Sequence, residues 1–378
     1  MENDGMNRRA FFAGAMATAA GAAGGGISLA EAQNAKARKK DVQPPRRSIL
    51  NFNSNMEYRR LGKTGLWASA VCMGGHWKRV SKMVSSAGGG CGYCKEDMAN
   101  VENPEFIKNR SDVLSRAMEM GINYVDACTG EEVLAYAKAL KGRRQKMYLG
   151  YSWYQRESRN KEYRSPAKLL EAFDQGLKQA GLDYVDVWRM TLPQDGLPDL
   201  AELQRVEEVS FEALDKARQQ GKARFTGIST HHRTWLKSVI EQYPQTIQVV
   251  CTPYTASSKE LPTDSVFSAI RKFDVGVFGI KPFAENALFK GDGSDTSPVR
   301  EEDDLRARLA IRNILSNPAI TAPIPGLISM RQVDNVAKAI AERRKLDAKE
   351  TAHLEQVSKE MWANLRPSHR WLKNWEYV

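Results

Sequence analysis

The sequence predicts a (β/α)8 barrel, and three observations lead to this fold class. Short apolar runs alternate with amphipathic helical segments along most of the 378-residue chain, an order typical of a parallel sheet. Eight such strand–helix units can be counted, which is the number that closes this barrel. No Gly-x-Gly-x-x-Gly follows the first strand, which disfavours the competing doubly wound sheet.

The predicted elements begin near residue 56 with a β-hairpin, in which two short strand-like runs flank Gly62-Lys63-Thr64-Gly65. Strands are predicted at residues 70–75, 123–128, 147–152, 185–191, 223–230, 247–253, 275–282 and 321–326. Helical periodicity occupies residues 167–179, 200–220, 235–241, 265–273, 305–315 and 331–340. A further amphipathic segment, with Val113, Leu114, Ala117 and Met118 on one face, leads into Gly121.

Two segments depart from plain alternation. An insertion at residues 78–109 follows the first strand and carries Cys91-Gly92-Tyr93-Cys94, and a Trp-rich tail at residues 362–378 follows the last helix. In this fold the long loops that follow strands lie on the C-terminal face of the barrel, where sites are built.

The N-terminus has the layout of a bacterial twin-arginine export signal. Arg8-Arg9 is followed by aromatic residues, a weakly apolar Ala/Gly run and the small-residue pattern Ala30-Glu31-Ala32. We therefore expect the twin-arginine translocation machinery as a partner and a periplasmic or extracellular mature chain that begins near Gln33 and lacks a membrane span. The chain then divides into a signal peptide (1–32), a basic flexible linker (33–55), the barrel (56–345) and a C-terminal helix and tail (346–378).

The charge of the chain does not indicate a nucleic-acid partner, although the formal net charge is +11. Lysines and arginines are scattered over many helices beside Asp and Glu, and one basic cluster, Lys36-Ala37-Arg38-Lys39-Lys40, lies in the linker. A solvated surface with a basic tether explains this pattern, and attraction to anionic surfaces is also compatible with it.

The stretch from Gly121 to Gly130 contains the strand end on which the site is predicted. A short apolar strand ends there in Asp126, and a buried carboxylate is costly unless its charge is used. Arg189, in the fourth predicted strand, is a candidate partner for Asp126, although its side chain could equally face outward.

Five segments resemble, in the same order, segments of the aldo/keto reductases; they are residues 56–66, 121–126, 182–186, 221–229 and 324–326. The resemblance implies a (β/α)8 barrel that binds NADP across its C-terminal face. It also implies reduction of carbonyls by hydride transfer with an Asp, Tyr, Lys, His tetrad.

Of that tetrad only Asp126 is present. Thr129 lies nearest the tyrosine position, Tyr151-Ser152 stands where the lysine closes the third strand, and Met190-Thr191-Leu192-Pro193 stands where the histidine closes the fourth. The family tyrosine donates a proton and the lysine lowers its pKa, whereas Thr and Ser hydroxyls are too weakly acidic to replace it. Tetrad-type reduction should therefore lose the roughly 10²–10⁴-fold that general acid catalysis supplies.

The side of the site that binds the cofactor is partly retained. The resemblance assigns cofactor contacts to Ser229, Thr230, Tyr254, Lys281, Pro282, Gly326, Ser329, Arg331 and Asn335. Tyr254 would stack on the nicotinamide and Arg331 would suit a 2′-phosphate, whereas Cys251 falls where a glutamine is usual. NADP or NAD is thus the expected cofactor, and outside the cytoplasm it would need to be tightly bound. The alternative for Tyr254 and Pro282 is that they simply cap a barrel.

Hydride chemistry would need a proton donor from the other polar groups at the predicted strand ends. These are His76, Tyr151, Tyr154, Arg189 and the pair His231-His232. His231 and Tyr151 are the leading candidates, so the predicted catalytic set is Asp126, Tyr151 and His231. A histidine at the start of a loop is equally compatible with a packing role.

Cys91 and Cys94 allow three interpretations. A local disulfide suits an oxidising compartment, and a metal site would recruit His76 or Cys128 as further ligands. A thioredoxin-type centre is disfavoured because the motif follows three glycines rather than opening a helix. No metal ligands are assigned.

The leading hypothesis is an exported oxidoreductase that transfers hydride between NAD(P) and a carbonyl or alcohol, such as a sugar, at a rebuilt site. The alternative is a non-catalytic barrel that binds a ligand or partner. The incomplete tetrad would then indicate that catalysis has been lost.

Overall fold

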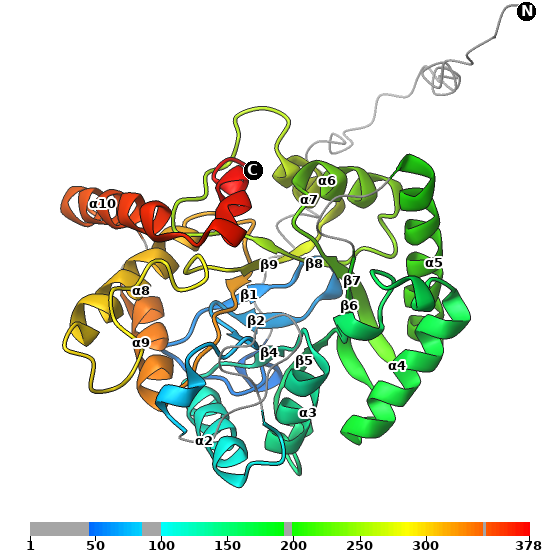
Figure 1. Cartoon of the computed structure of the whole chain (residues 1–378), viewed down its shortest axis with the longest axis horizontal. Coiled ribbons are helices and arrows are strands. Elements are labelled where there is room, and N and C mark those ends of the chain that lie inside the picture. Colours follow the sequence, from blue (N-terminus) through cyan, green and yellow to red (C-terminus); the bar gives the residue numbers. More distant parts are fainter. Residues whose placement is uncertain (1–44, 85–99, 193–198, 343–344) are drawn as a thin grey trace, which may run out of the picture. The chain divides into compact units, whose positions relative to one another are not determined.

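Eight parallel strands pair with one another in chain order and curl into a barrel (Figure 1). The computed structural model describes residues 45–84, 100–192, 199–342 and 345–378. The strands are β3 (Met73–Gly74), β4 (Tyr124–Asp126), β5 (Tyr148–Tyr151), β6 (Val185–Thr191), β7 (Ala223–Ser229), β8 (Val249–Pro253), β9 (Gly276–Ile280) and β10 (Ala322–Pro323). Backbone hydrogen bonds from Cys72 N to Pro323 O (3.1 Å) and from Gly74 N to Pro325 O (2.8 Å) close the ring. The predicted (β/α)8 fold is confirmed.

Helices cover the outside of the barrel (Figure 1). In the described residues they are α2 (Pro104–Glu119), α3 (Gly130–Ala139), α4 (Pro166–Ala180), α5 (Leu200–Gln219), α6 (Arg233–Gln242), α7 (Val266–Phe273), α8 (Arg300–Ile314), α9 (Met330–Ala341) and α10 (Ala348–Asn364). Local sequence sets their ends: Ser165 caps α4 by accepting a hydrogen bond from Lys168 N, Pro166 occupies its first turn, and Gly181 ends it in the left-handed conformation. Helix α8 begins five residues before its predicted start because its acidic first turn, which suits a helix N-terminus, carries no apolar periodicity.

The predicted N-terminal hairpin is confirmed, and it packs against the start of β9. Strands β1 (Tyr58–Arg60) and β2 (Trp67–Ser69) pair antiparallel. Lys63 N donates to Asp274 O (2.6 Å), and Arg60 forms an ion pair with the Asp274 carboxylate (2.7 Å). Gly62 has a φ of 49°, and a Cβ there would overlap the backbone at Gly276. The approach of the hairpin to β9 therefore requires glycine at this position.

Apolar side chains fill the interior of the barrel. They are Leu61, Leu66, Ala68, Cys72, Tyr124, Val187, Val249, Cys251, Phe278, Ala322 and Ile324. The rings of Tyr124 and Phe278 stack with their centroids 4.2 Å apart. A second apolar layer lies between the strands and the helices. Because the interior is filled, a site in this barrel has to lie at the strand ends.

The described end of the predicted linker packs against the barrel instead of being flexible. Ile49 is buried, and Asn51 Nδ2 donates to Ile122 O (3.0 Å) and to Lys146 O (2.8 Å). The predicted signal segment at residues 1–32 and the Cys91–Cys94 motif lie outside the described residues. Across the described ranges, every helix falls short of the length and apolar character that a membrane crossing requires.

Candidate functional site

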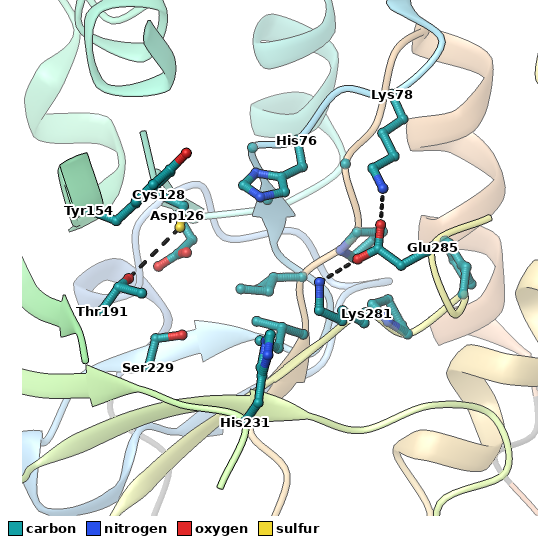
Figure 2. A pocket seen from close by; sticks show the side chains of 18 of the residues that line it. His76, Lys78, Asp126, Cys128, Tyr154, Thr191, Ser229, His231, Lys281 and Glu285 are labelled. Atoms are coloured by element: carbon teal, nitrogen blue, oxygen red, sulfur yellow. Dashed lines mark hydrogen bonds and ion pairs between the residues drawn. The ribbon is translucent and has the colours of Figure 1, made fainter. Parts of the chain in front are cut away.

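A cavity lies at the C-terminal ends of the strands, above the filled interior (Figure 2). Its polar lining comes from His76, Lys78, Asp126, Cys128, Tyr154, Arg159, Arg189, Thr191, Ser229, His231, Lys281, Glu285 and Asn286. Of the residues predicted from sequence, the structure brings Asp126, Ser229, His231, Lys281, Pro282 and Gly326 to this cavity.

A buried ion pair lies at the bottom of the cavity. Arg189 Nε donates to Asp126 Oδ1 (3.1 Å), and Arg189 Nη2 donates to Asp126 Oδ2 and to Ala127 O (3.1 Å). The two side chains are 2% and 4% exposed. Burial disfavours a charged guanidinium, but the Asp126 carboxylate holds the pKa of Arg189 well above its ordinary value. The predicted partnership is confirmed, and Arg189 supplies the counter-charge that a lysine supplies in the family pattern.

A glycine in the neighbouring strand makes room for this carboxylate. Gly150 of β5 pairs with Asp126 of β4, and a side chain there would overlap Tyr124 and the Asp126 carboxylate. The Tyr124 hydroxyl lies 3.4 Å from Asp126 Oδ1, and Cys251 Sγ lies 4.0 Å from it. On the side of the barrel interior, Asp126 thus receives a hydrogen bond from the Tyr124 hydroxyl and lies near the Cys251 thiol.

A hydrogen-bonded network occupies the strand ends where the family lysine and histidine would lie. Ser152 Oγ donates to Glu157 Oε2 (2.8 Å) and lies 2.9 Å from Thr191 Oγ1. Glu157 also accepts hydrogen bonds from Thr191 N (2.6 Å) and Trp153 N (3.1 Å). Burial raises the pKa of the Glu157 carboxyl, and these hydrogen bonds offset that effect only in part. Ser152 and Thr191 are thus held in place, but neither supplies the positive charge of the family pattern.

Thr129, the residue nearest the tyrosine position, is a helix cap. Its Oγ1 accepts a hydrogen bond from Glu132 N (3.2 Å), and the Glu132 carboxylate accepts one from Thr129 N (3.3 Å). This capping box begins α3. Glu132 Oε2 also accepts a hydrogen bond from Cys128 N (2.7 Å). Because Thr129 is fully buried, it cannot act on a substrate.

Glu132 also binds His76, which faces the cavity. His76 Nδ1 lies 2.5 Å from Glu132 Oε1, and among the described residues His76 Nε2 has no hydrogen-bond partner. Burial would raise the pKa of Glu132, but the charge and hydrogen bond of His76 and the backbone N–H of Cys128 lower it overall. His76 has a φ of 52°, a strained conformation for a residue with a side chain. A histidine held at one ring nitrogen by a buried carboxylate can exchange a proton at the other.

His231, one of the two predicted proton donors, lies in the cavity wall. Its ring stacks on Trp371 with centroids 4.0 Å apart. Burial, and then the positive charges of Lys281, His232 and Arg159, hold the pKa of His231 well below its ordinary value. The ring is therefore neutral near pH 7, so it can donate or accept a hydrogen bond there.

Tyr151, the other predicted donor, does not line the cavity. Its ring packs edge-on against Phe173, with centroids 5.1 Å apart, in the layer between the barrel and the helices. Its buried hydroxyl has no hydrogen-bond partner among the described residues. The assignment of Tyr151 to the catalytic set was wrong, because successive side chains of a strand point to opposite faces and this one points outward.

The loop after β5 supplies two cavity residues, Tyr154 and Arg159. Tyr154 N donates to Cys128 O (3.2 Å), and Figure 2 shows the two side chains close together. The Arg159 guanidinium lies over the Tyr154 ring, 4.8 Å from its centroid.

The opposite wall is formed by the loop after β9. Lys78 and Lys281 both bind the Glu285 carboxylate (Figure 2). Lys281, Ala284, Glu285 and Asn286 all have positive φ values, between 46° and 69°. Such backbone conformations are costly for residues with side chains and cluster at ligand-binding segments.

The C-terminal tail packs against His231 from outside the cavity lining. Its 3-10 helix η8 (Pro367–Trp375) places Trp371 on His231, and Trp375 Nε1 donates to His231 O (2.8 Å). The end of the chain is fixed by hydrogen bonds to Val378 O from Leu261 N (2.8 Å) and from Ser265 Oγ (2.7 Å).

Five predicted cofactor contacts lie outside this cavity, and two of them, Tyr254 and Thr230, are buried in the fold. Tyr254 is buried against Phe267, and its hydroxyl accepts a hydrogen bond from Asn317 Nδ2 (3.2 Å). Thr230 is fully buried, and its Oγ1 accepts a hydrogen bond from His232 N (3.1 Å). Tyr254 therefore points into the layer between the strands and the helices, away from the cavity in which a nicotinamide was predicted to stack on it, and it does not cap the barrel either.

A second cavity adjoins the first and shares Lys78, Phe283, Asn286 and Gly326 with it. Arg331 and Asn335 line this second cavity, and Ser329 caps α9 beside it. Arg331 Nη1 binds Asp304 (2.6 Å), and Arg331 Nε binds Asp295 (2.7 Å). Because these carboxylates already match the charge of Arg331, its predicted suitability for a 2′-phosphate is weakened.

The described part of the chain offers no metal site, since it holds no group of three or more His, Cys, Asp or Glu arranged for one. Cys72, Cys128 and Cys251 are free thiols. Burial raises the pKa of Cys128 and Cys251, so both remain protonated near pH 7. The interpretations of Cys91 and Cys94 fall on residues outside the described ranges.

A closed barrel with a polar groove across the C-terminal strand ends defines the class of the chain, a (β/α)8 protein that can bind an extended ligand. The model of the aldo/keto reductase family matches residues 102–308, more than half of the sequence, and the chain belongs to this family.

Individual relatives are distant. An L-galactose dehydrogenase from Arabidopsis thaliana is 23% identical over 314 residues, which cover 78% of this chain and 91% of that protein. The solved aldo-keto reductase AKR11C1 from Bacillus halodurans, in its holo form, superposes with a TM-score of 0.56 at 23% identity and covers 83% of this chain and 99% of its own. An aldo/keto reductase from Brucella melitensis gives a TM-score of 0.52 at 16% identity, covering 80% and 99%. At these identities the two structures establish the fold alone.

The residues of the site that sequence reasoning missed include Glu132, Glu157, Arg159 and Glu285. The Thr-x-x-Glu pattern from Thr129 to Glu132 is a capping-box signature, so it could have located Glu132 at a helix start. The other three lie in loops, and their contacts depend on which strand ends become neighbours when the barrel closes.

Proposed function

We propose that the chain is a nicotinamide-dependent oxidoreductase that interconverts an alcohol and a carbonyl, with His76 exchanging the proton. Membership of the aldo/keto reductase family supports oxidoreductase activity. The observation that carries the proposal is the contact of His76 Nδ1 with the buried Glu132, which leaves Nε2 toward the cavity. This pair has the arrangement of a general acid–base, which Tyr151 and His231 lack.

In the oxidation direction, the substrate hydroxyl gives its proton to His76 Nε2 while the hydrogen on the same carbon leaves with two electrons; reduction reverses both transfers. A bound nicotinamide would accept or supply that hydride. Glu132 accepts the hydrogen bond from Nδ1–H, fixes the tautomer and stabilises the imidazolium that forms.

Arg189 has a separate role in the proposed reaction. It lines the cavity, and Asp126, Ala127 and Thr191 fix its guanidinium in one position. A preorganised cation stabilises the negative charge that develops on the reacting oxygen, and it does so without reorganising during the reaction.

The groove formed by the two cavities fits a dinucleotide. Ser229 lies in the first cavity, where its hydroxyl could bind the nicotinamide amide, and the Lys281 loop, which joins the two cavities, could bind the phosphates. At the far end, Asp304 and Asp295 surround Arg331 with negative charge. A ribose 2′-hydroxyl can donate to the Asp304 carboxylate, which already holds Arg331, so we propose NAD over NADP.

A polyhydroxylated substrate such as a sugar is the class we propose. Its support is the relative whose printed activity is L-galactose dehydrogenase. The polar lining of the cavity, which presents Ser229, His231, Thr191 and Tyr154, suits hydroxyl groups.

The test uses the natively exported chain. Dinucleotide binding is measured by titration of NADH and NADPH, and turnover is followed with a panel of aldoses that includes L-galactose. His76→Gln should lower turnover by about 10²–10⁴-fold while leaving the dinucleotide affinity unchanged. His353→Gln, an exposed position on α10, is the matched control and should change neither. Failure of both dinucleotides to bind, or full activity of His76→Gln, would rule the proposal out.

A non-catalytic, ligand-binding barrel is the second candidate function. The observation that favours it is the Ser152–Thr191–Glu157 network, which fills the strand ends of the family lysine and histidine with fixed hydroxyl groups. Binding of a sugar without any turnover, in the presence of either dinucleotide, would favour this candidate.

We also propose export by the twin-arginine route, on the basis of Arg8-Arg9 and the segment that follows. Replacing both arginines by lysine should retain the chain in the cytoplasm, as measured by cell fractionation. Unchanged export of this variant would contradict the proposal.

A further inference from the structure

The charges that line the first cavity do not balance. Four formal cations, Lys78, Arg159, Arg189 and Lys281, line it with two carboxylates, Asp126 and Glu285. A cavity that presents an excess of positive charge attracts anions.

The partners of each cation show which of them carries the excess positive charge. Asp126 pairs with Arg189 at the bottom of the cavity, and Glu285 binds Lys281 and Lys78 together on the β9 side. Arg159 comes from the loop after β5. Throughout the described ranges, no carboxylate lies within ion-pair distance of its guanidinium, and its recorded contact is the face of the Tyr154 ring at 4.8 Å. An aromatic face orients an arginine while leaving its N–H groups available.

His231 lies in the same cavity wall and responds to the same charges. Arg159 is one of the cations that, after burial, hold the pKa of His231 below its ordinary value. A neutral His231 keeps a ring N–H that can donate to an anion, and its ring is fixed by stacking on Trp371.

We infer that the substrate carries an anionic group, a carboxylate or a phosphate, which Arg159 binds with the help of His231. The substrate class rests on the proposed function, because the lysine wall opposite Arg159 is assigned there to the dinucleotide phosphates. Arg159 is then left to the substrate, and it forms two parallel hydrogen bonds with either kind of anion.

The test compares the binding of three polyols that differ at one end: sorbitol, gluconate and sorbitol 6-phosphate. Binding is measured by calorimetry to the exported chain, with and without NADH. None of the three can react with NADH, because none carries an aldehyde or ketone group that NADH could reduce. One of the two anions should bind about 10- to 100-fold more tightly than sorbitol, as expected for charge-assisted hydrogen bonds, and the tighter one identifies the group.

Two arginine variants show which arginine causes the preference for the anion. Arg159→Ala should abolish the preference for the anion. Arg156→Ala should retain it, because Arg156 lies three residues away on the same loop, is half-buried and stacks on Trp153 at 4.3 Å, but does not line the cavity. The preference should also weaken as salt is added.

The outcomes separate this inference from the proposed function. Equal binding of the three polyols, no binding of any of them, or an anion preference that survives in Arg159→Ala overturns the role of Arg159. A loss of NADH affinity in Arg159→Ala, with the polyol preference unchanged, overturns it as well and assigns Arg159 to the cofactor. An anion preference that depends on Arg159 in a chain without hydride transfer upholds the inference while the proposed function fails.

Discussion

The Asp126–Arg189 pair allows a stability prediction whose size follows from its burial. Each side chain is at most 4% exposed, and the guanidinium also donates to Thr191 Oγ1 (3.1 Å) and to Ala127 O (3.1 Å). Arg189→Met would leave the carboxylate buried without a counter-charge, which costs about 3–5 kcal/mol of unfolding free energy. Asp126→Leu would likewise leave the guanidinium buried without a counter-charge, at a similar cost.

The double variant is the informative one. With both charges removed, the desolvation cost disappears along with the attraction, and replacing such a pair by apolar groups is often close to neutral. Asp126→Leu combined with Arg189→Met should therefore be destabilised by at most about 3 kcal/mol, well below the sum of the single effects. The small remaining loss reflects the hydrogen bonds that Ala127 O and Thr191 Oγ1 lose.

Urea unfolding of the mature chain, followed by both circular dichroism and tryptophan fluorescence, measures these differences, provided that the two probes give coincident transitions. Arg189→Lys is a useful control, because it keeps the charge but cannot form the two-pronged contact. A loss below about 1 kcal/mol in both single variants, or a double variant equal to their sum, would refute the reasoning.

Three further predictions follow from other sites. Tyr151→Phe removes a buried hydroxyl that has no partner in the described part of the chain, so thermal unfolding should show unchanged or higher stability, and turnover should not change. A large loss of turnover would restore Tyr151 as a catalytic residue. Asp304→Asn should remove one of the two carboxylates that bind Arg331 and shift the relative affinity toward NADP by roughly fivefold in a dinucleotide titration, and an unchanged ratio would contradict the assignment of the second cavity. Burial and the nearby positive charges of Lys281 and Lys78 lower the pKa of His369 from 6.5 to about 4. As the pH falls, the unfolded chain therefore protonates this histidine before the folded chain does, so stability should fall as the pH drops from 6.5 to about 4. His369→Gln should flatten that part of the stability–pH curve, and a curve identical to that of the wild type would show that His369 is not responsible.

The fold could be predicted from the sequence because each strand–helix unit has its own apolar periodicity. The ends of the strands were less predictable, since apolar residues continue beyond the hydrogen-bonded ladder. Residues 70–75 were predicted as one strand, but β3 contains only Met73 and Gly74. The rest of that run still closes the barrel, through the hydrogen bond of Cys72 N.

The site was only partly predictable. Asp126 was evident from its place at the end of an apolar strand. Arg189 could be proposed as its partner only as a candidate, because the two residues come from β4 and β6, on either side of β5, and the sequence does not show which way the arginine points. The direction of Tyr151 depends on the register of a four-residue strand, where a shift of one residue exchanges the two faces. Tyr254 lies just past β8, where it turns into the outer layer.

Contacts between distant loops carried no sequence signal. Glu285 binds Lys78 across more than two hundred residues, and Trp371 meets His231 from the C-terminal tail. These contacts follow from the closure of the barrel and from the fixed chain end, neither of which local periodicity encodes.

The claim that His76, and not a tyrosine, exchanges the proton is tested most directly by the rate of a single turnover of hydride transfer. The comparison is between His76→Gln and Tyr154→Phe, since Tyr154 is the tyrosine that lines the cavity. The site geometry predicts that His76→Gln slows the transfer by about 10²–10⁴-fold and that Tyr154→Phe slows it by less than about tenfold. The opposite ranking would contradict the account and assign the proton to Tyr154.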